Sequence, residues 1–415
     1  MKKNNGKILT SLFSLAVGAT LLTGCGGGDA GGEGGDVQLE LFSNKSENME
    51  TYEGLIAEFE EQNPTIDIEL NAPPEAETVL KSRLTKNDMP DLMAIGGNAT
   101  YGDLAEAGIF KDFSGSDYLE QIQPAYIDMI NKLVGEETEG TYGIPYATNA
   151  NTVIYNKDKL EELGLEVPKT WDEFVNALEE AKAAGEIPVQ FTLKDAWTGM
   201  ISWNSVAANI QPDNFAAKKS AGEASFQEHY SEVADKMLTL VEYGHDDNFG
   251  VGYSDGNTAF GNGEGVFYFQ GNWAIPEIKK ANPDINLGVF PMPVTNNPEE
   301  NKLVSGVDVL FAMSTETEHE EEARKFIEFL LEQEKAKQYI DEQAAFSAVK
   351  GVLQEDPVME GIKQNFEEGT ITSFPDHYYP AGMQAANLIQ AFLIEKNKDE
   401  FLKKLDNEWD KVENR

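Results

Sequence analysis

The chain has 415 residues, of which 40% are hydrophobic and 10% aromatic, so an intrinsically disordered protein is excluded and about two domains are predicted. It carries 73 Asp and Glu against 32 Lys and Arg, a formal net charge of −41. Phosphate groups bind clustered basic side chains, so nucleic acid is not expected as a partner and anionic headgroups are disfavoured. The acidity is typical of a solvated surface that keeps a protein soluble.

The first 36 residues are typical of an export signal followed by a tether. Three lysines precede an apolar run at residues 8–22, which would rise about 22 Å as a helix and is too short for a ~30 Å hydrocarbon core. The run ends at Leu-Thr-Gly-Cys, which resembles the bacterial lipoprotein signal, and Cys25 is the single cysteine. We therefore expect a signal segment with a lipidated Cys25 over residues 1–25. Residues 26–36 are Gly-rich and predict a flexible tether of about 18 Å reach.

Strands and helices are predicted to alternate from residue 37 onward. Alternating apolar residues predict a strand at 37–41, and an i, i+3, i+4, i+7 stripe from Tyr52 to Phe59 predicts an amphipathic helix that Pro64 ends. Further strands are predicted at residues 66–70, 92–95, 152–155, 187–193, 265–269 and 307–313.

Two capping motifs mark later helices. Thr170 with Glu173 forms a capping-box pattern, and Thr317 with Glu320 predicts the start of another helix. The apolar stripe of that second helix is Ala323, Phe326, Ile327, Leu330 and Leu331. Strands that alternate with helices indicate α/β domains with mostly parallel sheets.

Polar and aromatic residues follow four predicted strands, where open α/β sheets bind their ligands. They are Asn44 with Lys45, Asn98, Asp195 with Trp197, and Asn272 with Trp273. Aromatic rings stack on the apolar faces of pyranoses, and amides and carboxylates satisfy their hydroxyls, so this set of residues suits a sugar.

Catalytic and metal-binding motifs are absent from the sequence. The four histidines have no metal-ligand spacing, and HExxH, CxxC, GxSxG and a Walker lysine are all missing. We therefore expect no enzyme, no metal and no cofactor. A glycosidase needs only two carboxylates at the right separation, so that class stays open.

Several short motifs occur in the order found in one protein family. They are residues 59–64 (FEEQNP), 88–92 (DMPDL), 145–160 (PYATNANTVIYNKDKL), 168–174 (PKTWDEF) and 263–273 (GEGVFYFQGNW). Together they resemble the carbohydrate-binding family 1 of the extracellular solute-binding proteins of ABC importers. The chain departs from the family pattern at Thr152, where a smaller residue is usual.

The resemblance implies a two-lobed periplasmic-binding-protein-like α/β fold with a central ligand cleft, whose lobes close on the solute about a hinge. The implied crossings between lobes lie near residues 146–149, 305–308 and 345–349. Lobe one would then be residues 37–147 plus 307–345, and lobe two residues 148–306 plus 346–415.

We expect nine ligand-binding residues, from this resemblance and from the polar and aromatic residues that follow the predicted strands. They are Lys45, Asn98, Trp197, Gly271, Asn272, Trp273, Asp308, Asp376 and His377. Trp273 would be the cleft aromatic, Gly271 would let the backbone approach the solute, and Asn272 would offer its amide or a backbone N–H. Asp308, at the second crossing, would accept hydrogen bonds from sugar hydroxyls.

The expected function is the capture of an extracellular carbohydrate and its delivery to membrane permease subunits. More than one stacking platform favours an oligosaccharide. We expect a monomer, held at the outer face of the cytoplasmic membrane by the lipid on Cys25. A binder of polycations or another non-sugar solute would also suit the acidic surface, and a secreted glycosidase is the third alternative.

Overall fold

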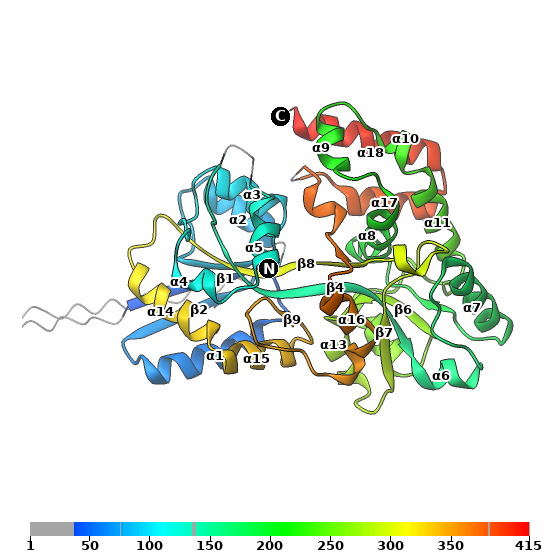
Figure 1. Ribbon diagram of the computed structural model, residues 1–415, viewed down its shortest axis with the longest axis horizontal. Coiled ribbons are helices and arrows are strands. Elements are labelled where there is room, and N and C mark those ends of the chain that lie inside the picture. Colours follow the sequence, from blue (N-terminus) through cyan, green and yellow to red (C-terminus); the bar gives the residue numbers. More distant parts are fainter. Residues whose placement is uncertain (1–36, 75, 135–137, 381, 415) are drawn as a thin grey trace, which may run out of the picture. The chain divides into compact units, whose positions relative to one another are not determined.

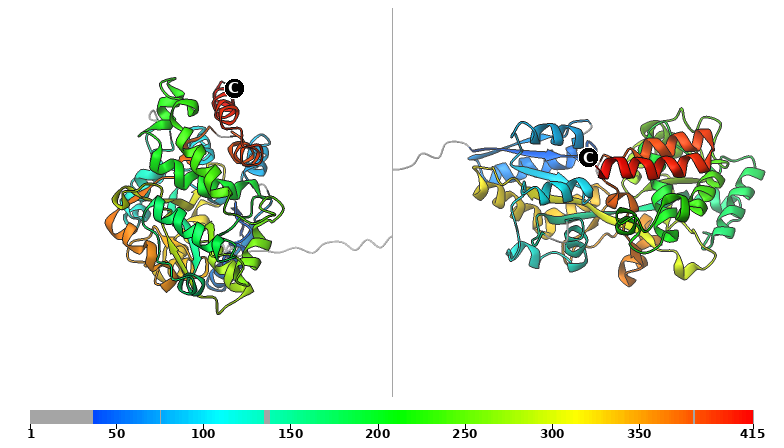
Figure 2. Two further views of the ribbon diagram at one scale, coloured as in Figure 1. Left: turned by 90° about the vertical axis from the view of Figure 1, so that its right-hand side faces the viewer. Right: turned by 90° about the horizontal axis from the view of Figure 1, so that it is seen from above.

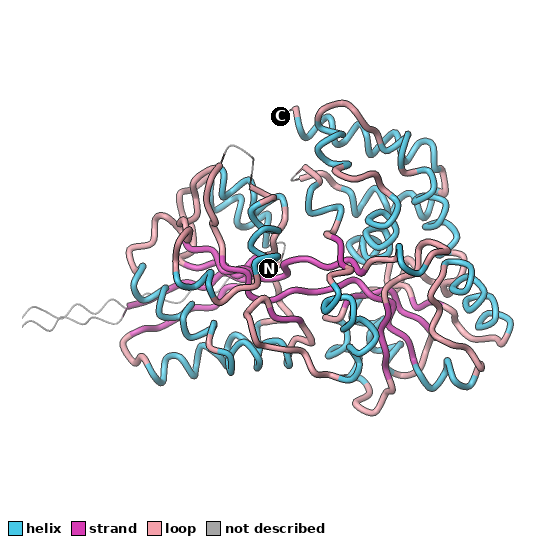
Figure 3. Tube along the Cα trace, in the orientation of Figure 1, coloured by secondary structure: helices cyan, strands magenta, loops and turns pink. Residues whose placement is uncertain are grey.

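The computed structural model describes residues 37–74, 76–134, 138–380 and 382–414. The predicted signal segment, Cys25 and the tether lie outside the described residues. Helices and strands alternate through the described ranges, and the strands run between groups of helices (Figures 1 and 3).

The elements follow one another in three stretches of chain. The first comprises β1 (Val37–Ser43), α1 (Met49–Gln62), β2 (Ile66–Asn71), α2 (Ala76–Leu84), β3 (Leu92–Ile95), α3 (Ala99–Glu106), α4 (Asp117–Glu120), α5 (Pro124–Asn131) and β4 (Ile144–Asn156). The second comprises α6 (Lys157–Glu162), α7 (Trp171–Ala183), β5 (Val189–Gln190), the 3-10 turn η1 (Ala196–Thr198), α8 (Gly199–Ile210), α9 (Phe215–Ser220), α10 (Phe226–His229), α11 (Ser231–Val241), α12 (Tyr253–Gly261), β6 (Phe267–Gly271), α13 (Ala274–Ala281) and β7 (Leu287–Phe290). The third comprises η2 (Pro298–Glu300), β8 (Leu303–Met313), α14 (Glu320–Leu331), α15 (Gln333–Glu342), β9 (Phe346–Ser347), η3 (Pro357–Met359), α16 (Glu360–Glu368), β10 (Ile371–Thr372), η4 (Pro375–Tyr378), α17 (Ala385–Glu395) and α18 (Lys398–Glu413).

The first lobe is built on β1, which pairs in parallel with β2 on one side and with β3 on the other. β3 continues the sheet by pairing antiparallel with β8. The predicted α1 stripe is confirmed, because Tyr52, Leu55, Ile56 and Phe59 are all buried in this core. The predicted α14 stripe is buried in the same core.

β4 and β8 are long antiparallel neighbours that contribute to more than one core (Figure 1). Their register runs from Ile144 opposite Phe311 to Ala150 opposite Ser305. Along β4, Ala147 is buried in the first core and Ala150 in another, so the strand passes from one core to the next within three residues. Two neighbouring strands that pass between cores together supply a continuous connection between the lobes.

The second lobe surrounds the other half of β4. β6 and β7 both pair antiparallel with β4, and β5 adds to β6 in parallel. One apolar cluster lies against α7, α8, α11, α17 and α18, and a smaller one against α12, α13 and α16. Seen from above, the blue elements of the first lobe are grouped apart from the red α17 and α18 of the second (Figure 2). None of the helices within the described ranges is both long enough and apolar enough to cross a membrane.

After α15, the chain contributes buried residues to two different cores. Phe346 is buried in the small cluster with Ala344, whereas Ala348, Val349 and Val352 are buried in the first core. The first core therefore includes a few residues beyond residue 345, where lobe one was expected to end.

Two expectations from the sequence are wrong. The sheets are not mostly parallel: of the nine strand pairings among the described residues, five are antiparallel, and all five involve β4 or β8. β4 runs antiparallel to every strand that it pairs with, and β8 runs antiparallel to β3 and β4. Periodicity within a strand does not reveal this direction. Thr317 does not cap α14 either, because its hydroxyl donates to Asp91 Oδ1 at 2.6 Å and the helix begins at Glu320.

The other capping motif is confirmed. Thr170 Oγ1 accepts from the N–H of Glu173 at 3.3 Å, and Glu173 Oε2 accepts from the N–H of Thr170 at 3.2 Å. This reciprocal pair satisfies two backbone donors at the start of α7, whose stripe from Phe174 to Ala181 is buried as predicted.

Candidate functional site

A cleft of about 1220 Å³ is lined by residues of both lobes. The first lobe contributes residues from the β1–α1 loop and from α1, and the second contributes residues from η1, α12 and α13. The lining side chains that matter below are Asn44, Lys45, Glu47, Glu50, Glu53, Asn149, Trp197, Tyr253, Asn257, Trp273, Glu277 and Lys280. A volume of this size is large for a single sugar ring and suits a ligand of several rings.

Three aromatic side chains line the cleft, and two of them are the tryptophans that the sequence singled out. Trp197 is 42% exposed on η1, and its ring centroid lies 5.1 Å from that of Tyr253 at the start of α12. Trp273 is half-buried at the start of α13. An indole that is exposed in a cleft can stack on the apolar face of a ligand.

The structure gives Gly271 a different role from the expected one. A methyl group built on Gly271 would lie 1.9 Å from Cζ3 of the Trp273 ring. Glycine is therefore needed because the indole folds back over the backbone of β6, and the space beside Gly271 is filled by that ring rather than left for a solute. Gly271 positions Trp273.

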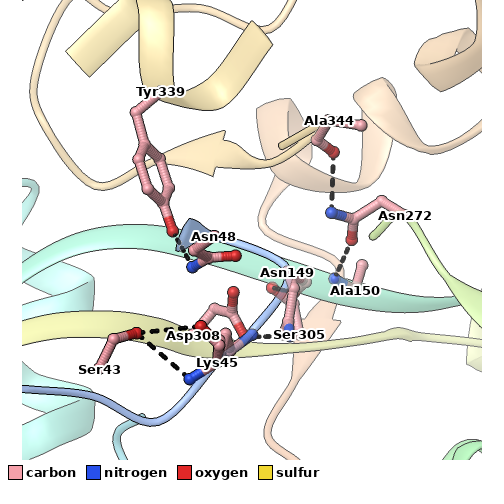
Figure 4. A network of polar contacts seen from close by, with 10 residues as sticks. All are labelled: Ser43, Lys45, Asn48, Asn149, Ala150, Asn272, Ser305, Asp308, Tyr339 and Ala344. Atoms are coloured by element: carbon pink, nitrogen blue, oxygen red, sulfur yellow. Dashed lines mark hydrogen bonds and ion pairs between the residues drawn. The ribbon is translucent and has the colours of Figure 1, made fainter. Parts of the chain in front are cut away.

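The side-chain amide of Asn272 is hydrogen-bonded to two backbone groups (Figure 4). Its side chain is 1% exposed; Oδ1 accepts from the N–H of Ala150 at 2.6 Å, and Nδ2 donates to the carbonyl of Ala344 at 2.8 Å. Its backbone N–H donates to the carbonyl of Ala150 at 3.3 Å. Asn272 ties β4 to the segment before β9 and does not present these groups to a ligand.

Lys45 and Asp308 are brought together beneath the cleft (Figure 4). Lys45 Nζ forms an ion pair with Asp308 Oδ1, and Asn149 Nδ2 donates to the same oxygen at 2.5 Å. Burial by itself lowers the pKa of Lys45, but the carboxylates of Asp308 and Glu47 outweigh it and raise that pKa above the usual lysine value. Within the described ranges Asp308 Oδ2 receives no hydrogen bond from the protein.

The remaining three predicted residues lie in a second cavity of about 310 Å³. Asn98, Asp376 and His377 line it together with Trp197, which thus faces both cavities. The predicted residues are therefore divided between two cavities: Lys45 and Trp273 line the first, these three residues line the second, and Trp197 lines both.

Each of these three side chains has a structural contact as well. Asn98 Oδ1 caps α3 by accepting two backbone N–H groups, at 3.0 and 3.2 Å. Asp376 Oδ1 accepts from Asn204 Nδ2 at 2.9 Å, and the His377 ring stacks on Phe374 with centroids 4.7 Å apart.

Sequence reasoning missed several groups in the main cleft. Asn44 Oδ1 and Asn257 Nδ2 are buried and have no hydrogen-bond partner among the described residues, and Asn257 as a whole is 3% exposed. One is an acceptor from the first lobe and the other a donor from the second, the two functions that a hydroxyl group satisfies. Asn44 stood at a predicted strand end, but nothing in the sequence marked Asn257, which lies inside α12.

Among the described residues, no three or more His, Cys, Asp or Glu side chains are grouped so that they could hold a metal ion. The charged side chains that line the cleft are two lysines, each in an ion pair, and four glutamates.

Comparisons with known proteins agree with this geometry. Residues 43–337 match the family described as bacterial extracellular solute-binding protein. The multiple sugar-binding protein of Streptococcus mutans is 31% identical over 336 residues, which cover 77% of each chain. The melibiose/raffinose/stachyose-binding protein MelE of Bacillus subtilis is 22% identical over 341 residues, covering 79% of this chain and 78% of MelE.

Solved structures are similar to this chain over nearly all of its described residues. RafE solved in complex with raffinose superimposes with a TM-score of 0.78 at 26% identity, over 91% of this chain and 100% of that chain. The apo form of RafE from Streptococcus pneumoniae superimposes with a TM-score of 0.76 at 27% identity, over 92% of this chain and 100% of that chain. This chain is a member of the bacterial extracellular solute-binding protein family.

Proposed function

We propose that this protein captures an extracellular oligosaccharide in the cleft between its lobes and delivers it to the permease subunits of an ABC importer. One observation carries the proposal: two indole rings, Trp197 and Trp273, line a single cleft, and its lining also includes Asn44 and Asn257, each of which has a buried amide atom without a partner among the described residues. Stacking rings beside neutral donors and acceptors suit uncharged sugars. The relatives named for raffinose, stachyose and other sugars point the same way.

The proposal assigns roles to the lobes and to the site. Residues 37–147 and 307–345 would move against residues 148–306 and 346–415, with the hinge at the three crossings. Trp273, Trp197, Asp308 and Lys45 would contact the ligand directly, and Asn98, Asp376 and His377 would contact a part of it that extends past Trp197. Such a protein binds without turnover, so release of reducing sugar at high protein concentration would contradict the proposal.

Ligand length provides the direct test. We expect affinity measured by calorimetry to rise from galactose through melibiose to raffinose and stachyose, because each ring added to a stacking platform contributes about 1 kcal/mol, or roughly fivefold. Equal affinity for galactose and raffinose would mean that one ring alone is recognised, and the second platform would then have no role.

We also propose that the mature protein is a monomer held by lipid on Cys25 at the outer face of the cytoplasmic membrane. Cys25→Ala is expected to release a folded protein into the medium with unchanged sugar affinity, because the thiol lies before the residues that form the lobes. Retention needs more than one acyl chain, since a single chain binds membranes only marginally. A Cys25→Ala protein that still sediments with membranes after lysis would contradict lipid anchoring.

A further inference from the structure

Carboxylates dominate the charged lining of the main cleft. Glu47, Glu50 and Glu53 lie along the first-lobe wall, in the β1–α1 loop and the first turns of α1, and all three are exposed. Within the described ranges none of these three has an ion pair or a side-chain hydrogen bond. Glu277 on α13 stands on the second-lobe wall.

Both lysines of the lining are already compensated. Lys45 is paired with Asp308, and Lys280 Nζ lies 2.8 Å from Glu277 Oε1. After these two pairs are set aside, the charges that line the cleft within the described residues are those of Glu47, Glu50 and Glu53. A ligand in this cleft therefore meets a negative potential with no uncompensated cation to offset it.

The effect of these charges reaches across the cleft. The Tyr253 hydroxyl belongs to the second lobe. Burial raises its pKa, the nearby Asn257 side chain lowers it, and the charges of Glu47 and Glu277 raise it further. The pKa of Lys280 is raised first by its hydrogen bond with Glu277 and also by the charge of Glu277 and that of Glu50 on the opposite wall. Glutamates of the first lobe thus act on groups of the second lobe that line the same cleft.

We propose that these glutamates make the cleft select saccharides by charge, favouring a sugar that carries a protonated amino group over its neutral parent and rejecting one that carries a carboxylate or phosphate. This inference rests on the proposed function and adds the charge class of its ligand. The neutral contacts remain the indole rings and the buried, unpaired Nδ2 of Asn257, which lines the same cleft, so a neutral sugar still binds. A positive charge on the sugar raises its affinity above that of the neutral sugar, and a negative charge lowers it.

The expected size follows from screened Coulomb interactions. One unit charge a few ångströms from a carboxylate in a water-filled cleft changes affinity by about three- to tenfold at low salt, and the Debye length of about 3 Å at 1 M salt removes most of that change. The amine and the acid should therefore differ by at least about tenfold at low salt and converge at high salt.

The test compares raffinose with two derivatives of it, in which the C6 hydroxyl of the terminal galactose is replaced by an amine or oxidised to a carboxylate. Affinities are measured by calorimetry on the full chain at 20 mM and at 1 M salt. At low salt we expect the amine to bind most tightly, raffinose less tightly and the carboxylate most weakly. Glu50→Gln/Glu53→Gln should reduce the difference in affinity between the amine and the carboxylate derivative, because two of the carboxylates that line the cleft become neutral. Glu61→Gln is the matched control, because Glu61 is exposed on the same helix but does not line the cleft.

The outcomes separate the two proposals. If raffinose binds and both derivatives bind with the same affinity, charge selection by the cleft is wrong and sugar binding stands. The same conclusion follows if Glu61→Gln reduces the affinity difference between the two derivatives as much as the double variant does. If neither raffinose nor stachyose binds while the simple polyamine spermidine does, the proposed ligand class is itself wrong. Melting temperatures of both variants within about 2 °C of the parent protein would confirm that each is folded.

Discussion

Trp273→Ala is expected to weaken oligosaccharide binding about ten- to a hundred-fold, because it removes one of the two indole platforms and stacking contributes on the order of 1–3 kcal/mol. The ring is half-buried, contacts the small apolar cluster and lines the cleft. We therefore expect only a modest fall in the melting temperature of the unliganded protein. Calorimetry with raffinose and a thermal melt on the same preparation measure both quantities.

Trp203→Ala is the matched control for this experiment. Trp203 is fully buried on α8, where its indole N–H donates to the Tyr379 hydroxyl at 3.1 Å. Truncating a core tryptophan costs about 3–5 kcal/mol of folding free energy, so this variant should melt much earlier while its folded fraction binds sugar normally. If Trp273→Ala behaves like Trp203→Ala, with a large loss of stability and unchanged affinity, Trp273 is a core residue and not a platform.

Asn272→Ala is expected to destabilise the protein by about 2–4 kcal/mol, because two buried backbone groups lose their partners at once and each costs about 1–3 kcal/mol. The groups are the N–H of Ala150 on β4 and the carbonyl of Ala344, which Asn272 joins from a position that is 1% exposed. The melting temperature should fall by several degrees, and the sugar affinity of the folded protein should change little.

An exposed asparagine with the same kind of bridge provides the comparison. Asn297 accepts from the N–H of Glu299 and donates to Glu300 Oε1, but its side chain is exposed. Water replaces both partners when Asn297 is truncated, so Asn297→Ala should cost about 1 kcal/mol or less. Loss of sugar binding in Asn272→Ala with an unchanged melting temperature would instead restore the ligand-binding role that the sequence suggested.

The sequence by itself determined those features whose cause is local. The stripes of α1, α7 and α14 follow from apolar residues three and four positions apart, and the capping box of Thr170 needs only residues within one turn. Trp197 and Trp273 were identified because each follows a predicted strand, and both line the cleft. For Gly271 the sequence identified the right residue but not its reason, which is the ring of Trp273 two positions later.

Only the tertiary structure decided the features that depend on distant segments. The partners of Asn272 lie 122 and 72 residues away along the chain, so its structural role could not be separated from a ligand-binding one by motif alone. The antiparallel pairing of β4 with β8 and the presence of Glu50 and Lys280 in the lining of one cleft have the same origin. A periodic pattern reports which face of an element is buried, whereas the neighbour that buries it is chosen by long-range packing, which no local pattern encodes.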